Sequence, residues 1–302
     1  MTVPPVAREG QTFEGGSRLV RYANFVKLPH TVFALPFALV GVTLATRQAA
    51  LTPAIVGWVV LAFTAARFAA MAFNRIVDRE YDGANPRTAM REIPSGTMSV
   101  AEARALVVVA IAIFGLAAWR LNPLCLALAP LAIGWVLFYS YTKRFTQFSH
   151  LVLGLGLGIA PVGGYLAVAG AWPEPWWMLV VLALGVMSWT AGFDILYALQ
   201  DIAFDRERGL HSVPARMGAQ GALRFARALH VVTVLSLAAV GFATNASWLY
   251  AAGVLVAAGL LAFEHTLVKA DDVSKVDKAF FTVNMALSAT FFLFVLADRL
   301  FA

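Results

Sequence analysis

Long apolar runs separated by short polar segments occupy almost the whole chain. Each run has about 20 residues, the length that an α-helix needs to cross the hydrocarbon core of a bilayer. The runs predict nine membrane spans, near residues 25–47, 53–77, 101–119, 123–141, 148–169, 176–200, 222–243, 247–268 and 279–299. The pattern therefore predicts an all-α, polytopic membrane protein.

The composition agrees with this prediction. Of 302 residues, 60% are hydrophobic and 13% are charged, whereas about a quarter of the residues are charged in ordinary globular domains. The mean hydropathy is +0.75. No linker rich in Pro, Gly or Ser divides the chain, so we expect one domain over residues 1–302, of which residues 1–20 form a polar N-terminal tail. This tail lacks the apolar segment and cleavage site of a signal peptide, and we expect no removable leader.

The basic residues indicate how the spans are oriented. Most of the 23 lysines and arginines lie in alternate connections, and the other connections are short and nearly neutral, as in AWPEPWW at 171–177. Because cytoplasmic loops carry the excess of Lys and Arg, this bias predicts an N-in, C-out topology in the inner (plasma) membrane. It also explains the net charge of +6 without any nucleic-acid partner. Chemistry is expected on the cytoplasmic side.

Two groups of acidic residues lie at the ends of spans, where charge is costly. At about 100° per residue, Asn74, Asp78 and Asp82 fall on one face of a helix that continues the second span. The same arithmetic puts the acids of the sixth span on one face, with a tyrosine at its edge: Asp194, Asp201, Asp205 and Tyr197. Carboxylates near hydrocarbon cost several kcal/mol unless they are paired, hydrated or metal-bound, so both stripes are candidate functional sites.

Two facing acidic stripes repel each other unless cations lie between them. A set of carboxylate and amide oxygens suits Mg²⁺, which usually binds through a few carboxylates together with substrate phosphates. The pattern therefore predicts a diphosphate substrate. Several bases of the same cytoplasmic loops are candidates to contact phosphate oxygens: Arg75, Arg79, Arg87, Arg91, Lys143, Arg206 and Arg208.

Other interpretations remain open on the residues alone. Ordinary interfacial charge explains Arg79 and Glu80 equally well, but it does not explain Asp194, which lies about two turns inside an apolar span. A transporter also uses intramembrane acids, although it concentrates them near the midplane. A CDP-alcohol phosphotransferase shares Mg²⁺ and aspartates, but DGANPR at 82–87 breaks the helix where its DGxxAR motif continues.

The two acidic motifs resemble those of the UbiA superfamily of intramembrane prenyltransferases. Asn74, Asp78 and Asp82 match NxxxDxxxD, and the second stripe matches DxxYxxxDxxxD. The loops RTAMREIPSG at 87–96 and YTKRFT at 141–146 are also similar to loops of the family. DILYALQD at 194–201 resembles the 4-hydroxybenzoate polyprenyltransferase branch. The run LPHTVFALPFALVG at 28–41 resembles a relative thought to act in the futalosine route to menaquinone.

The resemblance implies nine helices around a central cavity and a Mg²⁺-dependent alkylation. A polyprenyl diphosphate would ionise, and an aromatic acid similar to 4-hydroxybenzoate would accept the prenyl group, giving a precursor of ubiquinone or menaquinone, while the isoprenoid tail extends into membrane lipid. Six residues would hold Mg²⁺: Asn74, Asp78, Asp82, Asp194, Asp201 and Asp205. Within this set Asp78, Asp194 and Asp201 would be catalytic.

The resemblance also implies roles around the metal. Tyr197 would steady the allylic cation or bind a phosphate, and Arg75, Arg87, Lys143 and Asn74 would bind the substrate. An N-terminal base, Arg21 or Lys27, would meet the carboxylate of the acceptor.

Some remaining polar residues carry no recognisable motif. The five histidines lack the spacing of zinc ligands, and Glu264 with His265 is interpreted as interfacial. Arg67 lies inside the second span, where it should face a cavity or an acid. The glycines of GLGLGIAPVGG at 154–164 predict close helix packing and not a dinucleotide site, because no strand precedes them.

Overall fold

The structure is a computed structural model that describes residues 13, 15, 17–27 and 29–302. Every regular element in these ranges is helical. Residues 1–12, 14 and 16 of the polar tail and Leu28, the first residue of the run 28–41, lie outside the described residues. The expectation of an all-α polytopic membrane protein is confirmed, because eight helical segments among the described residues are long and apolar enough to cross a membrane.

Six of these segments are single helices: α3 (Pro53–Val77), α5 (Val100–Leu121), α6 (Pro123–Thr142), α7 (Ser149–Ala169), α10 (Val213–Ala243) and α11 (Trp248–Leu267). A further segment, which corresponds to the expected sixth span, runs from α8 (Trp177–Ala198) through the short 3₁₀ turn η1 (Leu199–Asp201) into α9 (Ile202–Glu207). The eighth runs from α12 (Val276–Lys278) through the π turn η2 (Ala279–Val283) into α13 (Asn284–Phe301).

The first expected span, residues 25–47, is divided in the structure. Lys27 has a φ of 48°, and this left-handed residue separates α1 (Arg18–Phe25) from α2 (Pro29–Ala45). α2 has 17 residues, which at 1.5 Å per residue extend about 26 Å, less than the roughly 30 Å of a bilayer core. By length, the described part of the chain therefore holds eight spanning helices and not the nine expected.

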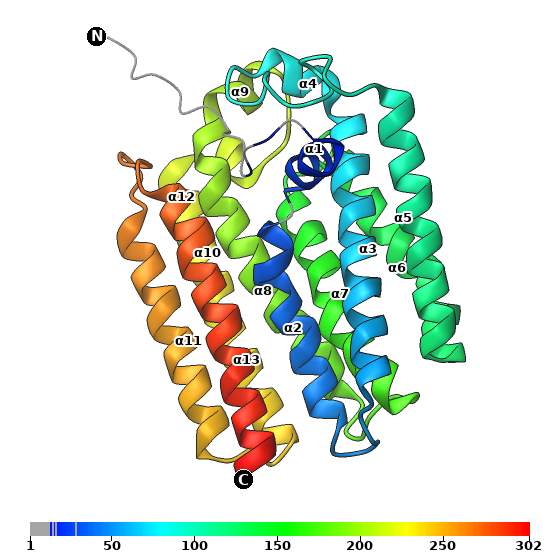
Figure 1. Ribbon diagram of the computed structural model, residues 1–302. Helices are drawn as coiled ribbons and strands as arrows, with labels where there is room; N and C mark the ends of the chain where they lie inside the picture. The colour runs from blue at the N-terminus through cyan, green and yellow to red at the C-terminus, as the bar shows by residue number, and fades with distance from the viewer. Residues whose placement is uncertain (1–12, 14, 16, 28) are drawn as a thin grey trace.

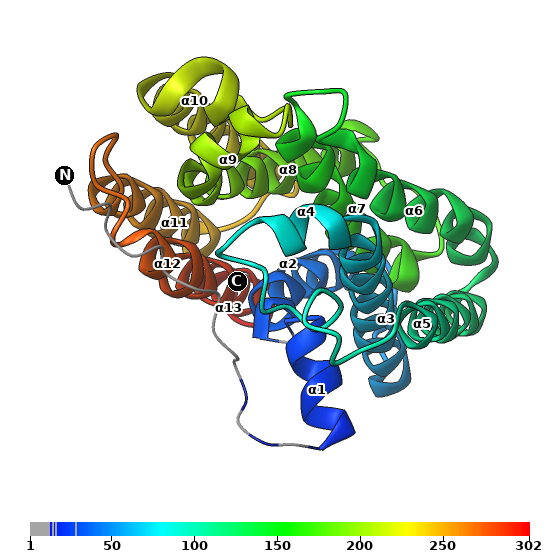
Figure 2. The ribbon, with the colours of Figure 1, turned by 90° about the horizontal axis from the view of Figure 1, so that it is seen from above.

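The long helices form a closed ring (Figures 1 and 2). In order around it, each helix packs on the next: α2, α3, α5, α6, α7, α8, α10, α11, α13 and again α2. α2 also packs on α7, so these two helices divide the ring into two parts. One end of the ring carries α1, α9 and α4 (Arg79–Ala84). Of these, α4 follows α3 and α9 follows α8 and η1, and each leads into a loop.

Glycines allow α7 to lie directly against α2 and α8. A Cβ atom added at Gly164 would lie 2.2 Å from the carbonyl oxygen of Ala38 in α2. A Cβ at Gly158 would lie 2.6 Å from the carbonyl oxygen of Ala183 in α8. The packing role predicted for the glycine-rich run is confirmed, because only a residue without a side chain permits these backbones to approach so closely.

Polar caps fix where several helices begin. Asn122 Oδ1 accepts the amide of Cys125 at 2.9 Å, and Pro123 follows the cap. Ser212 Oγ accepts the amide of Ala215 at 3.2 Å, and the same hydroxyl donates to Asp205 Oδ2 at 2.8 Å. These caps satisfy amides that have no partner within the helix. The Ser212 cap also ties the start of α10 to an acidic residue of α9.

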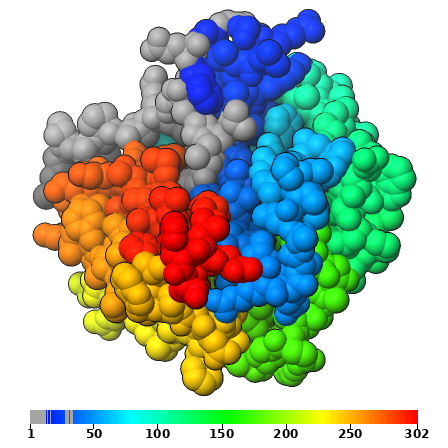
Figure 3. Space-filling view, turned by 60° about the horizontal axis from the view of Figure 1, so that its bottom comes forward, coloured from blue at the N-terminus to red at the C-terminus, as the bar shows by residue number. Residues whose placement is uncertain are grey.

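The end of α13 closes the ring at the face opposite α4 and α9. Arg299 donates to Thr46 at 2.9 Å, and Arg47 pairs with Asp298 at 3.2 Å. Figure 3 shows the end of α13 (red) on this face beside the connection from α2 to α3 (blue). The described chain therefore enters the ring at the end that carries α4 and leaves it at the other.

Candidate functional site

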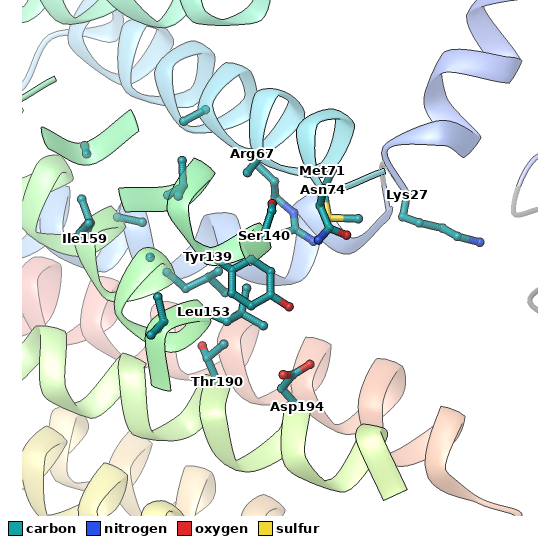
Figure 4. Close-up of a pocket in the computed structure, with 18 of the residues that line it drawn as sticks. Lys27, Arg67, Met71, Asn74, Tyr139, Ser140, Leu153, Ile159, Thr190 and Asp194 are labelled. Atoms are coloured by element: carbon teal, nitrogen blue, oxygen red, sulfur yellow. The ribbon is translucent and has the colours of Figure 1, made fainter. Parts of the chain in front are cut away.

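A cavity of about 430 Å³ lies in the part of the ring bounded by α2, α3, α5, α6, α7 and α8 (Figure 4). Its wall is mostly apolar, with residues such as Phe63, Val136 and Leu153. At the end near α4 and α9 the wall becomes polar, and all seven residues of the two acidic motifs line it: Asn74, Asp78, Asp82, Asp194, Tyr197, Asp201 and Asp205. The structure thus brings together two motifs that lie more than 100 residues apart in the sequence.

The first motif is held at the junction of α3 and α4. Asp78 lies between the two helices, with φ −91° and ψ 5°, and its backbone carbonyl accepts the amide of Asp82 at 2.8 Å. Asn74 Nδ2 donates to Asp78 Oδ2 at 2.8 Å. Burial, followed by the nearby charge of Asp82, raises the pKa of Asp78 to about 6. This carboxylate is therefore destabilised in its charged form and gains from a bound cation.

The second motif follows α8, η1 and α9. The 3₁₀ turn η1 tightens the chain at Asp201, which is buried together with Asp205. Asp205 accepts the Ser212 hydroxyl described above. Asp194 lies deeper, within α8, and Figure 4 shows its carboxylate near the hydroxyl end of Tyr139 from α6.

Arg87 joins the two motifs. It lies in the loop after α4, and its guanidinium donates to both carboxylate oxygens of Asp201, Nε to Oδ1 at 3.1 Å and Nη2 to Oδ2 at 2.7 Å. Its Nη1 donates to the Tyr197 hydroxyl at 3.2 Å. Burial alone would lower the pKa of Arg87, but Asp201 and Tyr197 together outweigh it and the net shift of the pKa is upward. The arginine therefore keeps its charge at the mouth of the cavity.

Lys143 adds a second cation at this mouth, directly after α6. Burial lowers the pKa of Lys143, but the carboxylates of Asp205, Asp201, Asp194 and Asp78 raise it, and the net shift is upward. The ammonium group is within electrostatic range of both acidic motifs. It is thus placed to bind an anion that lies between them.

The other predicted bases are distributed differently. Arg75 lines the cavity, and its Nε donates to the carbonyl of Phe25 in α1 at 3.3 Å. Lys27 also belongs to the lining, although Figure 4 shows its side chain extending away from Arg67. The Arg21 guanidinium donates to the Thr97 carbonyl at 3.1 Å and is not part of the lining.

The acidic residues do not form a ready-made metal cage. Among the described residues, no three Asp, Glu, His or Cys side chains are grouped closely enough to hold one ion. Arg91 pairs with Asp82 Oδ1 at 2.6 Å, while Asp82 Oδ2 is buried and has no hydrogen-bond partner in the described part of the chain. A site where the protein provides only one or two oxygen ligands to each ion suits a hard cation such as Mg²⁺. Such a cation keeps several bound waters and also binds phosphate oxygens of the substrate.

One functional candidate, His150, escaped the sequence argument, whereas the expected place of a second, Arg67, is confirmed. His150, on α7, lies with Nδ1 2.6 Å from Asp194 Oδ2, and its side chain is buried. Its distance in sequence from Asp194 gives no periodic signal that would have identified it. Arg67 lies two turns before Asn74 on the cavity side of α3, as expected of a cation inside a span, and Figure 4 shows it close to Ser140.

The fold and the site together define a class of protein: a polytopic helical membrane enzyme whose apolar cavity opens at an end lined by acids and bases. Residues 34–292 match the model of the UbiA prenyltransferase family. The chain belongs to this family of enzymes, which transfer prenyl groups. This membership favours the prenyltransferase interpretation over the phosphotransferase and the transporter.

Curated relatives and solved structures agree. The 4-hydroxybenzoate octaprenyltransferase of Citrobacter koseri is 30% identical over 233 residues, which cover 75% of this chain and 78% of the relative. The enzyme of the same name from Yersinia pseudotuberculosis is 32% identical over 221 residues, or 72% of this chain and 74% of the relative. A UbiA homologue from Aeropyrum pernix superposes with a TM-score of 0.81 at 33% identity, covering 90% of this chain and 98% of that one.

A more distant structure carries ligands. A UbiA homologue from Archaeoglobus fulgidus, solved with DMAPP and Mg²⁺ bound, superposes with a TM-score of 0.70 at 17% identity and covers 93% of this chain and 100% of that one. At this identity the likeness concerns the fold alone.

Proposed function

We propose that the protein transfers the prenyl group of an allylic polyprenyl diphosphate to the ring of an aromatic acid similar to 4-hydroxybenzoate, in a Mg²⁺-dependent step of ubiquinone or menaquinone synthesis. One observation carries the proposal: Arg87 bridges from the loop of the first acidic motif to Asp201 of the second, directly above an apolar cavity. A cavity with a charged mouth and an apolar wall suits a substrate that has a charged head group and an apolar tail.

The acidic motifs bind the diphosphate end of the donor. We infer that Asn74, Asp78, Asp82, Asp194, Asp201 and Asp205 hold Mg²⁺ at the cavity mouth. When bound, Mg²⁺ neutralises the charge that develops on the departing diphosphate. The unpartnered Asp82 Oδ2 and the raised pKa of Asp78 support this assignment.

The basic residues bind the same diphosphate head group of the donor. Lys143 is within electrostatic range of both motifs, and it binds phosphate oxygens as a point charge. Arg87 exchanges one of its contacts with Asp201 for the diphosphate, which the fork of its guanidinium allows. Arg75, the third base expected to bind the substrate, lies beside Asn74 at the same level of α3.

The reaction proper takes place where the polar mouth meets the apolar wall. The bond between the allylic carbon and the diphosphate oxygen breaks, and its electron pair stays on the oxygen. A ring carbon of the acceptor then forms a bond to the allylic carbon and passes its proton to a carboxylate of the site. The Tyr197 ring, which contacts Phe280 at a centroid distance of 4.5 Å, stabilises the cation by its π face and excludes water.

Arg67 is a better candidate than Arg21 to bind the carboxylate of the acceptor. Arg21 is not part of the cavity lining, whereas Arg67 lies in the cavity about 10 Å deeper than Asn74, given a rise of 1.5 Å per residue. Arg67 Nε and the Ser140 hydroxyl are both buried without a hydrogen-bond partner among the described residues. A carboxylate bound between them would satisfy both groups.

The topology follows from the same arrangement. α1 and α4 lie at one end of the ring, and the end of α13 lies at the other (Figure 1). α2 connects the two ends, so we propose that it serves as a short ninth crossing and that the chain is N-in, C-out. The acidic mouth then faces the cytoplasmic side of the inner membrane, and the excess of basic residues in its loops supports this orientation. The isoprenoid tail extends from the cavity into membrane lipid.

The test uses the purified protein in lipid nanodiscs with Mg²⁺, an allylic prenyl diphosphate and a panel of aromatic acids. We expect release of diphosphate and a prenylated acid, both lost in Asp78→Ala and Asp201→Ala. Glu80→Ala is the matched control, because the Glu80 side chain is 80% exposed on the same segment. Absence of diphosphate release with every acceptor, or full activity of both aspartate variants, would overturn the proposal.

A further inference from the structure

A second polar cluster is buried in the ring, away from the acidic mouth. Glu264 lies in the last turn of α11, near the end of its span as expected, but it is 0% exposed and does not face water. Its Oε1 accepts a hydrogen bond from Asn284 Nδ2 of α13 at 2.8 Å. Asn284 Oδ1 in turn accepts the indole N–H of Trp189 of α8 at 2.6 Å. A carboxyl group inside a membrane bundle is expensive to keep, and it calls for a functional reason.

The amide of Asn284 is fixed at both ends. The indole N–H of Trp189 is a donor only and therefore binds the oxygen, while the Glu264 oxygen accepts from the nitrogen. The same nitrogen also donates to the carbonyls of Ala279 at 3.2 Å and Phe280 at 3.1 Å. Both carbonyls belong to the π turn η2, which directly precedes Asn284.

A π turn replaces the hydrogen bonds between residues i and i+4 of an α-helix by bonds between i and i+5, and it occurs often at functional sites. Asn284 Nδ2 has two N–H groups, so with one donated to Glu264 the other is shared between the carbonyls of Ala279 and Phe280. The cluster of Glu264, Asn284 and Trp189 therefore stabilises a turn that would otherwise favour relaxation to a regular helix.

The π turn presents Phe280 to the reaction cavity. Phe280 lines the cavity, and its ring lies 4.5 Å from the ring of Tyr197 and 5.2 Å, edge-on, from that of Phe193. Trp189 packs edge-on against Phe193 at 5.0 Å. The polar cluster and the aromatic wall are thus continuous. Relaxation of η2 by one residue would turn Phe280 by about 100° around the helix axis and away from Tyr197.

We propose that Glu264, Asn284 and Trp189 are positioning residues, which hold η2 so that Phe280 closes the wall beside Tyr197 against water. The inference rests on the proposed function, since it assigns the wall a role in the fate of an allylic cation. Such a cation has two outcomes in the cavity: capture by the acceptor ring, which gives the prenylated acid, or capture by water, which gives a prenyl alcohol and releases a proton.

The test measures the ratio of prenyl alcohol to prenylated acid, together with the rate of diphosphate release. In Asn284→Ala we expect the ratio to rise roughly tenfold, the order expected when one aromatic face beside a cation is lost, with diphosphate release little changed. Phe280→Ala should give the same result. Phe281→Ala is the matched control, because Phe281 lies in the same turn but is not part of the cavity lining.

Two further variants separate positioning from general destabilisation. Glu264→Gln keeps an oxygen that accepts from Asn284, and it should retain the wild-type ratio, whereas Glu264→Leu should behave as Asn284→Ala. The double variant Asn284→Ala/Phe280→Ala should show no more effect than either single change, because both act through one ring. Multiplied effects, or an unchanged ratio in Asn284→Ala, would overturn the inference.

A ¹⁹F label separates this inference from the proposed function. With 4-fluorophenylalanine at position 280, the ¹⁹F resonance should shift in Asn284→Ala and stay in place in Glu264→Gln, whether or not the protein turns over a prenyl diphosphate. An unmoved resonance in Asn284→Ala would overturn the positioning role even in an active enzyme. Absence of transferase activity in the wild-type protein would overturn the proposed function. The ¹⁹F resonance would still show whether Asn284 positions Phe280.

Discussion

His150 Nδ1 lies 2.6 Å from Asp194 Oδ2, and the two side chains pair α7 with α8 beside the cavity. His150 is 1% exposed, so the carboxylate of Asp194 has a fixed neighbour where water is scarce. A carboxylate held in this way keeps one orientation toward the cavity.

The contact predicts that His150→Leu lowers kcat by about 10- to 100-fold, the usual cost of losing a partner that orients a functional carboxylate. His150→Gln should recover part of the loss, because its amide can donate to Asp194. His211→Leu is the control, because that histidine is exposed. The measurement is kcat and KM for both substrates, and wild-type kinetics in His150→Leu would contradict a role for the pair.

Arg67 should determine the preference for an acid as acceptor. In Arg67→Met we expect KM for the aromatic acid to rise by about 10- to 100-fold, since a charge-assisted hydrogen bond contributes about 1.5–3 kcal/mol. KM for the prenyl diphosphate should change little.

The sharper readout for Arg67 is discrimination between the acid and its methyl ester. The wild-type enzyme should prefer the acid strongly, and Arg67→Met should lose most of this preference. Arg104→Met removes an exposed arginine from the start of α5 and serves as the control. Retained discrimination in Arg67→Met would place the acceptor elsewhere.

The sequence predicted much of this site because its strongest signals are local. Asp78 and Asp82, or Asp201 and Asp205, repeat at helical spacing, and apolar runs of spanning length need no tertiary information. The partner of Asp194 could not be predicted, because the packing of α7 on α8 alone brings His150 to it. The burial of Glu264 could not be predicted for a similar reason: its position near the end of a span suggested water, but Asn284 of α13 contacts it.

The break between α1 and α2 also could not be predicted from the pattern of apolar residues. Hydropathy runs through Lys27 without interruption, because one lysine hardly changes the average of a long apolar window. The left-handed backbone at Lys27 lies next to a contact that is distant in sequence, because Arg75 Nε donates to the carbonyl of Phe25 at 3.3 Å. Hydropathy measures the apolar content of a segment, and it does not indicate where a helix breaks.

The Arg87–Asp201 pair predicts a stability effect that depends on ligands. Both side chains are largely buried, about 10% and 12% exposed. Arg87→Ala leaves Asp201 without its main partner, which can cost as much as about 3 kcal/mol. Without Mg²⁺, the melting temperature of Arg87→Ala should therefore fall clearly below that of the wild type.

Added Mg²⁺ should narrow this difference, because a bound cation compensates the charge of Asp201. The double variant Arg87→Ala/Asp201→Asn should melt higher than Arg87→Ala in EDTA, since it removes the uncompensated charge. Thermal unfolding in nanodiscs with EDTA or Mg²⁺ makes the comparison. Equal destabilisation of Arg87→Ala under both conditions would mean that the cation does not reach Asp201.

Two adjacent glycines of α7 offer a matched test of the packing that closes the cavity. A Cβ atom at Gly164 would lie 2.2 Å from the Ala38 carbonyl oxygen, whereas a Cβ at Gly163 would meet no atom within 4 Å. Gly164→Ala should therefore separate α7 from α2 and destabilise the protein by about 1–3 kcal/mol. Gly163→Ala should be neutral or slightly stabilising, because alanine favours the helix over glycine by roughly 1 kcal/mol. The measurement is the unfolding midpoint of both variants in the same nanodiscs, and equal midpoints would show that α2 and α7 do not meet backbone to backbone at Gly164.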